Sequence, residues 1–490
     1  MSDVHVVPVV PFVLGIPLVA AACLAGVQRT HVARTLNAGF SFATFVAALV
    51  LAARTVEHGP SFAFGRAFFV DPLNVYLVAL TAFVGWTTSL FSRPYMQVEE
   101  ARGRMTAARM RLYHSMYQLF MFAMLLALLT NNLGVLWVAM EAATLATVLL
   151  VSVYRTAASL EAAWKYFILC GVGIAQALFG TILLYLAASR QLADGDALLW
   201  TSLAAVKTHL DPTIVSIAFV FLLVGYGTKV GLVPMHSWLP DAHAEGPTPI
   251  SAVLSGLLLN VALYAVLRCK VLADGALGNG LPGRLLVGFG LVSVLVASFS
   301  LFRQKDVKRL FSYSSIEHMG LMTFAFGLGG PVATFAGLLH MTVHSLVKSA
   351  IFFAVGHAVQ KAGTQAIDGI RGLLQVSPTV GWGMMLGTLA ILGLPPFGVF
   401  ASEFLILTTA INTIPWTAPL LLLGLAVAFA AIFARVQRMV FGATTTARPL
   451  EHRPAPLPVF VHLGLGLMLG LYVPPYLAMW YRQAATMLAG

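Results

Sequence analysis

Three ionisable side chains recur at helical spacing in a stretch that is otherwise apolar. His340, His344 and Lys348 are each four residues apart in the run HMTVHSLVK. Positions i, i+4 and i+8 of a helix lie on one stripe, so these side chains would face the same direction. The glutamate of the zinc-binding pattern HExxH is absent, and the lysine one turn further on would repel a metal ion. The pattern therefore favours proton exchange over metal binding, because histidine titrates near neutral pH.

A second set of ionisable residues lies earlier in the chain. Glu141 is near the centre of an apolar run, and Lys229 ends another. A carboxylate at the centre of a membrane span costs about 3 kcal/mol, so Glu141 needs a partner or water. We expect Lys165 to be that partner, and we expect Glu141 to control the protonation of the buried Lys229. The alternatives are a neutral Glu141 in packing and lysines that extend to the membrane interface.

Two further residues could connect these sets to an exit. Glu403 follows an interruption in an apolar run, and we expect it to release protons; a position at the interface is the alternative. His318 could bridge the two groups, although a hydrogen-bonded core histidine is nearly as common. We interpret Glu317 and the basic residues 303–309 as loop or interface charges.

The composition requires a membrane to position these groups. The 490 residues are 59% hydrophobic and only 10% charged, whereas roughly a quarter of the residues in a soluble domain are charged. Apolar runs of about twenty residues, enough to cross a hydrocarbon core about 30 Å thick, recur along the sequence. The sequence therefore excludes a water-soluble domain and predicts about fourteen spans.

Two of the expected spans contain residues that break a helix. The first contains GLVP, which ends at Pro234, and the second contains GLPPFG, with Pro395 and Pro396. Proline removes a backbone hydrogen bond, and freed carbonyls at membrane depth require protein or water to satisfy them. We expect Asp241 and His243, just after the first break, to brace the broken helix; lining an entrance is the alternative.

The positions of the two breaks predict the organisation of the chain. Lys229 lies about 116 residues into a unit that begins near residue 113, and Glu403 about 119 residues into one that begins near residue 284, so the breaks match. We predict an all-α polytopic membrane protein with two inverted five-helix repeats, in which helices seven and twelve are broken. The single membrane domain, 1–490, would comprise three N-terminal helices (1–112), repeat 1 with helices 4–8 (113–272), repeat 2 with helices 9–13 (284–441) and a C-terminal helix (442–490).

The formal net charge of +11 indicates orientation rather than nucleic-acid binding. The basic residues are distributed among short loops, and the odd-numbered loops contain most of them. By the positive-inside rule these loops are cytoplasmic and both termini are periplasmic, in a bacterial inner membrane.

Redox and nucleotide chemistry of its own is not expected for this chain. Its three cysteines lie far apart and are too few for a four-cysteine iron–sulfur cluster. A P-loop and a strand-flanked GxGxxG are both missing from the sequence. We therefore expect no cofactor, no metal and no catalytic centre in this chain.

With these residues identified, the sequence resembles the antiporter-like membrane subunits of respiratory complex I, Mrp-type cation/proton antiporters and membrane-bound hydrogenases. The resemblance covers about residues 70–440, and within this superfamily the chain is most similar to hydrogenase-4 component F, through SLEAAWKY and GYGTK. The matching stretches are WVAME (137–141), TKVGLVPMHSWLPDAH (228–243), PTPISA (247–252), QKDVKRL (304–310) and PPF (395–397) through Glu403.

The resemblance implies fourteen helices, inverted repeats and a proton relay. The lysine–glutamate pair of the relay corresponds to Lys165 or Lys229 with Glu141, and its terminal group corresponds to Glu403. Many complex I relatives have a lysine or histidine in the eighth span, where this chain has Ser255 and Asn260. The connection from Lys229 to the second half therefore requires water or histidines.

We interpret the chain as the proton-translocating subunit of a hydrogenase-type or NADH-dehydrogenase-like complex, driven by redox chemistry in partner subunits. The alternatives are a sodium/proton antiporter subunit, a membrane partner in inorganic-carbon uptake, a membrane metallohydrolase and a structural anchor. The predicted relay residues are Glu141, Lys165, Lys229, His318, His340, His344, Lys348 and Glu403, with Pro234, Asp241, Pro395 and Pro396 supporting the helix breaks.

Overall fold

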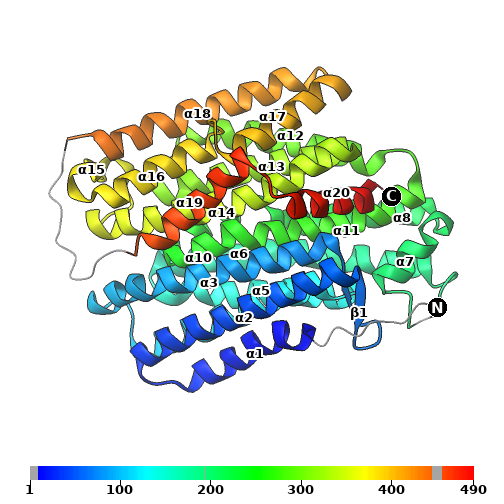
Figure 1. The fold of residues 1–490 in the computed structure, drawn as a ribbon, viewed down its shortest axis with the longest axis horizontal. Helices are drawn as coiled ribbons and strands as arrows, with labels where there is room; N and C mark the ends of the chain where they lie inside the picture. The colour runs from blue at the N-terminus through cyan, green and yellow to red at the C-terminus, as the bar shows by residue number, and fades with distance from the viewer. Residues whose placement is uncertain (1–8, 194, 444–454, 490) are drawn as a thin grey trace.

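The computed structural model describes residues 9–193, 195–443 and 455–489 as a bundle of long helices. The helices run roughly side by side, so that connections gather at the two ends of the bundle (Figure 1). Figure 1 shows the α1–α2 connection and α15 at the left end, and α7 and the last turns of α20 at the right end. This arrangement agrees with a predominantly helical membrane protein.

The N-terminal part contains three helices and a small hairpin. The elements are α1 (Val10–Gly26), α2 (Thr30–His58), β1 (Ser61–Ala63), β2 (Phe68–Val70) and α3 (Pro72–Ala101). The two strands are antiparallel, with Phe62 opposite Phe69. This hairpin could not be predicted from the sequence, because three-residue strands have too short a pattern to recognise.

The next segment contains the first broken helix. Its elements are α4 (Ala107–Leu129), α5 (Leu133–Val151), α6 (Ala157–Ala188), α7 (Trp200–Val206), α8 (Pro212–Val230), α9 (Trp238–Glu245), α10 (Thr248–Val253), the π-helical η3 (Leu254–Leu258) and α11 (Leu259–Leu277), with 3₁₀ turns η1 (Ser152–Tyr154) and η2 (Lys207–His209).

The last segment contains the second broken helix. Its elements are α12 (Leu281–Leu301), α13 (Val307–Leu328), α14 (Gly330–Ala362), the 3₁₀ turn η4 (Ile367–Gly369), α15 (Leu373–Val376), α16 (Pro378–Ile391), α17 (Gly398–Thr413), α18 (Thr417–Phe441), α19 (Leu457–Leu471) and α20 (Pro475–Ala489).

The all-α polytopic architecture is confirmed, whereas the number of fourteen spans stays a prediction. Among the described residues, ten helices are long and apolar enough to cross a membrane, and α19 with α20 would make an eleventh. The apolar helices α1, α16 and α17 are shorter than these ten. The second helix break divides the span that α16 and α17 would otherwise form together.

The expected single C-terminal helix in 442–490 is wrong for the part that the structure describes. Residues 444–454 lie outside the described residues, and the remainder forms two helices, α19 and α20, that enclose an angle of 75°. The chain turns at Pro474 and Pro475, where proline removes backbone donors and favours an extended preceding residue.

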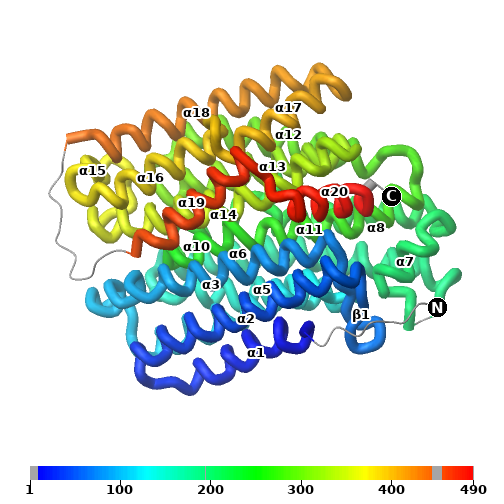
Figure 2. The backbone as a smooth tube through the Cα atoms, viewed as in Figure 1, coloured from blue at the N-terminus to red at the C-terminus, as the bar shows by residue number. Residues whose placement is uncertain are grey.

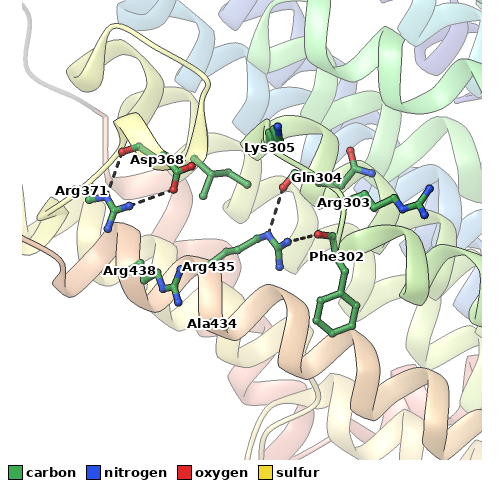
Figure 3. A pocket seen from close by; sticks show the side chains of 10 residues that line it. Phe302, Arg303, Gln304, Lys305, Asp368, Arg371, Ala434, Arg435 and Arg438 are labelled. Carbon is green, nitrogen blue, oxygen red and sulfur yellow. Dashed lines mark hydrogen bonds and ion pairs between the residues drawn. The ribbon is translucent and has the colours of Figure 1, made fainter.

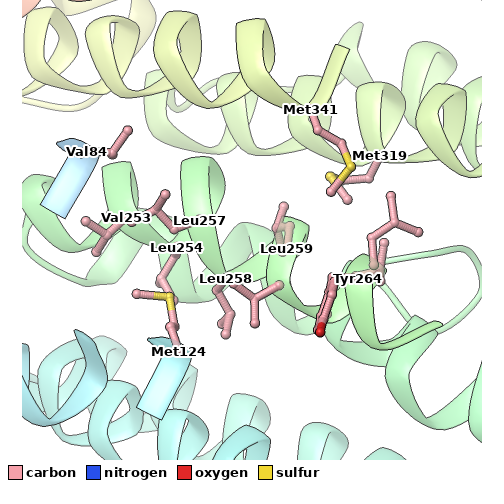
Figure 4. Close-up of a cluster of buried hydrophobic side chains, with 14 of the residues drawn as sticks. Val84, Met124, Val253, Leu254, Leu257, Leu258, Leu259, Tyr264, Met319 and Met341 are labelled. Carbon is pink, nitrogen blue, oxygen red and sulfur yellow. The ribbon is translucent and has the colours of Figure 1, made fainter. Parts of the chain in front are cut away.

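Two helical segments, Thr248–Leu277 and α14, form the centre of the bundle. The most apolar part of each is entirely buried, which is why neither shows a polar face. Figure 2 shows α11 and α14 between α1–α3 on one side and α17–α18 on the other. Figure 4 shows Val253, Leu257 and Leu259 within the core cluster, between Met124 and Met341.

A buried ion pair connects the N-terminal helices to the first broken-helix segment. Asp71 caps α3 by accepting a hydrogen bond from the Asn74 backbone nitrogen (2.9 Å), and the Asn74 side chain accepts one from Asp71 in return. The other Asp71 carboxylate oxygen accepts from Arg268 of α11 at 2.5 Å. The Arg268 guanidinium also lies 4.3 Å from the centre of the Trp200 ring, so this contact fixes α3, α7 and α11 together.

Candidate functional site

Lys229 lies in the last turn of α8, at the first helix break, and is completely buried. Its ammonium group donates a hydrogen bond to the hydroxyl of Thr144 on α5. It also lies 5.2 Å from the centre of the Tyr166 ring on α6. A lysine held between three helices by a hydroxyl and an aromatic face is not extended to the interface, so that alternative is wrong for Lys229.

Glu141 is on α5, one helical turn before Thr144. Its Oε2 is buried and has no hydrogen-bond partner among the described residues. Glu141 lies within electrostatic range of Lys229, although the two side chains make no direct ion pair. The carboxylate and the ammonium group therefore interact electrostatically without touching, and a water molecule could connect them.

The expected pair between Glu141 and Lys165 is not formed in the structure. Lys165 on α6 is half exposed and lies 2.7 Å from Glu161 and 3.3 Å from Asp241. The reason is its position near the start of α6, where the side chain can reach water and carboxylates at the helix end. Lys165 thus contributes to a surface ion-pair group rather than to the site around Glu141.

The first break is stabilised by contacts with neighbouring elements. Gly231 adopts a φ of 82°, which favours glycine, and the Val233–Pro234 bond is cis. The Trp238 indole donates to the Thr228 carbonyl at 2.8 Å, which gives this carbonyl a second donor beside the Gly231 backbone nitrogen (3.2 Å). On the far side of the break, Asp241 accepts from Arg309 of α13 at 2.7 Å.

The two breaks share one backbone pattern. Gly231 and Gly393 both have positive φ, and each donates to the carbonyl three residues earlier. The following residues, Leu232 and Leu394, each donate to the carbonyl five residues earlier. The helix before each break also shares a neighbour with the helix after it, since α6 packs on α8 and α9 while α14 packs on α16 and α17. These correspondences support the predicted repeats, whose inverted orientation stays a prediction.

Aligning the two glycines changes one predicted correspondence. Glu403 lies 403 − 393 = 10 residues after its glycine, and Asp241 lies 241 − 231 = 10 residues after the other. Glu403 is therefore matched by Asp241, and Lys229 is matched by the apolar Ile391. The match of Lys229 with Glu403 was counted from approximate unit boundaries rather than from the breaks, and it stays a prediction.

The second cluster contains the residue that we expected to be the exit. Nδ1 of His318 on α13 lies 3.0 Å from Nε2 of His340 on α14 and 3.9 Å from Oε1 of Glu403 on α17. The other ring nitrogen of His340 lies 2.9 Å from the Ser402 hydroxyl. Both histidines are buried, and the Glu403 side chain is only 12% exposed. Three groups that can exchange protons therefore lie next to one another. His318 therefore has buried neighbours on two other helices, and its bridging role stays a prediction.

Ser402 favours one tautomer of His340. The Ser402 oxygen lies 2.9 Å from the Val399 carbonyl and 3.1 Å from the Gly398 carbonyl, and when its single hydrogen is donated to either of them, the oxygen accepts from Nδ1 of His340. The Nε2 atom of a neutral His340 then accepts a hydrogen bond from Nδ1 of His318. Ser402 was not among the residues predicted from the sequence, although its position directly before Glu403 was an available signal.

The predicted stripe on α14 continues from this contact. The ring of His344 lies 5.6 Å from that of His318, centre to centre, and both of its nitrogens are buried without a partner among the described residues. One turn further, the Lys348 ammonium donates to the Phe311 carbonyl at 3.1 Å. Buried polar atoms without protein partners are normally satisfied by water, so we expect ordered water at His344.

Two charges interpreted as belonging to loops or the interface are buried. Glu317 lies within α13 and interacts electrostatically with Lys348. The Lys308 ammonium donates to the backbone carbonyls of His243 (3.2 Å), Ala244 (2.8 Å) and Gly246 (2.7 Å) at the end of α9. Lys308 therefore satisfies the free carbonyls of a helix C-terminus. Lys308 is one of the basic residues 303–309, and Glu317 follows them closely in the sequence. The sequence alone therefore did not indicate that either side chain is buried.

Asn260, the neutral residue in the central helix, forms hydrogen bonds with α14. The Asn260 amide donates to the Met341 carbonyl (3.0 Å) and to the Ser345 hydroxyl (2.8 Å) of α14. Ser255 lies within the π-helical η3 and contacts the Ser315 hydroxyl of α13 at 2.7 Å. π-helical turns often occur at functional sites. This contact places a polar step between α10–α11 and α13.

His243 is a further candidate at the junction of the two halves. It is completely buried at the end of α9, and neither ring nitrogen has a partner among the described residues. Its ring centre lies 5.2 Å from that of Phe352, which is one turn beyond Lys348 on α14. The His243 ring therefore forms none of the hydrogen bonds with described residues that the expected bracing role would require.

The histidine cluster also has the donor types of a metal site. One ligand atom each from His318, His340 and Glu403 lies within 4.8 Å of the others. Nitrogen and carboxylate ligands suit zinc. The 3.0 Å contact between the two rings is nevertheless a hydrogen-bond distance, so the cluster is satisfied by proton sharing as it stands.

Buried titratable groups beside two broken helices define an ion-translocating type of membrane protein. The chain belongs to the family described as NADH:quinone oxidoreductase/Mrp antiporter, TM, whose model matches residues 130–429. It is similar to the hydrogenase-4 component F homolog of Methylacidiphilum infernorum, with 49% identity over 474 residues that cover 96% of this chain and 98% of the relative. NADH-quinone oxidoreductase subunit N of Desulforudis audaxviator is 28% identical, over 81% of this chain and 75% of the relative.

Solved structures share the fold. A chain of the membrane-bound sulfane sulfur reductase, an archaeal respiratory membrane complex, superposes with a TM-score of 0.89 at 24% identity and covers 98% of each chain. A chain of the Mrp complex from Dietzia gives 0.83 at 18% identity, over 98% of this chain and 99% of that one. Both belong to multisubunit membrane complexes, and the resemblance inferred from the sequence is confirmed.

Proposed function

We propose that this chain is the proton-translocating, antiporter-like subunit of a membrane-bound hydrogenase or NADH-dehydrogenase-like complex. Redox chemistry in partner subunits would drive it, and the chain itself would move protons. The observation that carries the proposal is the contact of His318 with His340 and Glu403, because three exchangeable groups from three helices meet beside a broken helix. A purely structural anchor would not need to bury such groups, since burial is expensive in a membrane.

The first half of the path would be the site around Lys229. The Thr144 hydroxyl and the Tyr166 ring hold its ammonium group, and Glu141 supplies a nearby negative charge. When Glu141 turns toward Lys229, the charged ammonium is stabilised; when Glu141 turns away, the lysine releases its proton more readily. A conformational signal from partner subunits that moves α5 would therefore control proton release.

The second half would run along α14 to α17. Lys348 would receive the proton, and water at His344 would carry it to the pair of His318 and His340. Ser402 keeps His340 oriented so that a proton can pass from ring to ring and then to Glu403. Each step would require only rotation of a ring or reorientation of a water molecule.

Between the halves we propose a link through His243 and water. His243 lies near Phe352, one turn from Lys348, and has two ring nitrogens free of protein partners among the described residues. The contact of Ser255 with Ser315 offers a second polar step nearby. This link would replace the lysine or histidine that relatives have where this chain has Asn260.

The path requires an external source of energy. Moving one charge against 100 mV takes about 2.3 kcal/mol, which the redox chemistry of the complex would provide. We place the chain in a bacterial inner membrane, with its basic odd-numbered loops in the cytoplasm and both termini in the periplasm. Lys165 would then belong to the surface ion-pair group with Asp241, at the end of the bundle where α6 begins.

The proposal is tested by proton movement in vesicles that contain the assembled complex. We expect Lys229→Ala and Glu141→Ala each to abolish most proton movement while the partner redox reaction continues in uncoupled vesicles. Lys361→Gln, which removes a less buried lysine at the end of α14, is the control. Unchanged proton movement in both site variants would contradict the proposal, and sodium-dependent proton movement by the isolated chain would identify a sodium/proton antiporter instead.

A further inference from the structure

A basic cavity of about 600 Å³ lies where three segments meet at one end of the bundle. The segments are the α12–α13 connection, the α14–α15 connection and the last turns of α18 (Figure 3). Five of its lining side chains are cationic and one is acidic, a formal balance of 5 − 1 = +4. The charged residues are Arg303, Lys305, Asp368, Arg371, Arg435 and Arg438.

Most of this positive charge is not compensated by the residues that the structure describes. Arg303, Lys305 and Arg438 have no side-chain partner among the described residues. The Arg435 guanidinium is held by the carbonyls of Phe302 (2.5 Å), Ala431 (2.9 Å) and Gln304 (3.4 Å), as Figure 3 shows for two of them. Carbonyls fix its position but leave its charge, so the cavity presents several cations to an anion.

The surroundings of the cavity are apolar and face outward. Phe302 is 51% exposed at the end of α12, and Phe441 is 53% exposed at the end of α18. Val292, Val296 and Phe299 continue an exposed apolar stripe along α12 at helical spacing. Because α12 and α18 are membrane spans, the cavity lies at the boundary between hydrocarbon and water, with an apolar surface leading up to it.

We propose that this cavity binds the phosphate headgroup of an anionic phospholipid, with its acyl chains along α12. Arginine matches phosphate geometry with paired hydrogen bonds, and basic pockets at the ends of membrane helices favour anionic headgroups. A volume of about 600 Å³ is within the range of small-ligand sites. An acidic segment of a partner protein would satisfy the charge but would not use the apolar stripe, so the lipid fits both features.

The lipid would brace the segment that begins α13. The cavity is lined by residues 302–305, and α13 starts at Val307 and carries His318. A headgroup bound in the cavity would hold the α12–α13 connection against α18, because cationic side chains of both segments would bind the same phosphate. This role is independent of the proposed proton path.

The test compares lipid retention and thermal stability of the purified full chain in nanodiscs. The Arg303→Gln/Lys305→Gln variant removes two cations whose side chains have no partner among the described residues, so its fold is expected to persist. We expect it to retain about tenfold less phosphatidylglycerol and cardiolipin by lipid mass spectrometry than the unmodified chain. Its thermal shift between anionic and phosphatidylcholine nanodiscs should also decrease.

Arg54→Gln/Arg190→Gln removes two exposed charges elsewhere and is the matched control. Inorganic phosphate alone, added to phosphatidylcholine nanodiscs, should not reproduce the thermal shift. Equal lipid retention in the two double variants would overturn the proposal. It would also be overturned if phosphate alone gave the full shift, or if a co-purified acidic subunit were crosslinked in the cavity.

Discussion

At the scale of single residues, the structure separates a buried set of ionisable groups from a surface ion-pair group. The buried set is centred on Lys229 in one half and on His340 in the other, whereas Lys165 pairs with carboxylates in water-accessible surroundings. The distinction depends on helix position: Lys229 ends α8 at a break inside the bundle, and Lys165 begins α6 at its end. Sequence hydropathy does not distinguish these two lysines, because both are followed by apolar residues.

Ser402 provides a test of how His340 is oriented. Ser402→Ala removes the acceptor for Nδ1 of His340, so the ring can adopt the other tautomer and lose its hydrogen bond with His318. We expect a decrease of about threefold to tenfold in the proton flux of the assembled complex, as for the loss of one hydrogen bond. Thr408→Ala, on an exposed face of the same helix, should leave the flux unchanged. Equal flux in the two variants would show that Ser402 does not orient the relay.

The metal content of the purified protein tests the interpretation of the histidine cluster. The ring nitrogens of His318 and His340 already share a hydrogen bond, and Lys348 lies on the same stripe of α14 as His340. A divalent ion would therefore displace a satisfied contact and face a nearby cation. Elemental analysis after dialysis should find far less than one zinc per chain. One equivalent that disappears in the His318→Asn variant would favour the metallohydrolase instead.

At the scale of elements, the broken helices explain why the groups meet. Residues 231–234 and 393–396 combine glycine with proline, and the sequence predicted both breaks. What followed each break was not predictable, because the direction of the second half-helix depends on contacts such as that of Trp238 with the Thr228 carbonyl. The same limit applies to Glu317 and Lys308, whose burial is determined by neighbouring helices rather than by local sequence.

Gly393→Ala tests the geometry of the second break. An added Cβ would collide with Oε2 of Glu403, and the φ of +66° disfavours alanine. We expect Glu403 to be displaced and proton flux to decrease at least about tenfold, while the complex still assembles. Gly464→Ala on α19, where a Cβ meets open space, is the matched control. Normal flux in Gly393→Ala would indicate that Glu403 is not the exit group.

Asp71→Asn tests the contact that joins the N-terminal helices to α11. The variant keeps a capping side chain but removes the charge that pairs with the buried Arg268. Breaking a buried pair from one side costs about 3–5 kcal/mol, so the thermal midpoint in detergent should fall by several degrees. Asp196→Asn breaks the exposed pair with Arg66 and should have little effect. Equal midpoints would show that the Asp71 pair does not stabilise the fold.

At the scale of the whole molecule, composition and spacing were sufficient for the architecture. The apolar runs, the two breaks and the stripe from His340 to Lys348 predicted an all-helical membrane protein with a buried relay. The small hairpin, the bend between α19 and α20 and the position of His243 depend on tertiary packing, which short sequence patterns do not encode. The basic cavity is lined by three segments that are up to 136 residues apart, from Phe302 to Arg438, so it could not be predicted from the sequence.

The proposed mechanism requires one continuous proton path through both halves of the protein, and Lys348 lies where the two halves join. The most direct test is the number of protons moved per electron by the assembled complex carrying Lys348→Met in sealed vesicles. The variant removes the only cation on the α14 stripe formed with His340 and His344, while methionine preserves most of the buried volume. We predict that the ratio falls while redox turnover in uncoupled vesicles is retained. An unchanged ratio would contradict a path through Lys348.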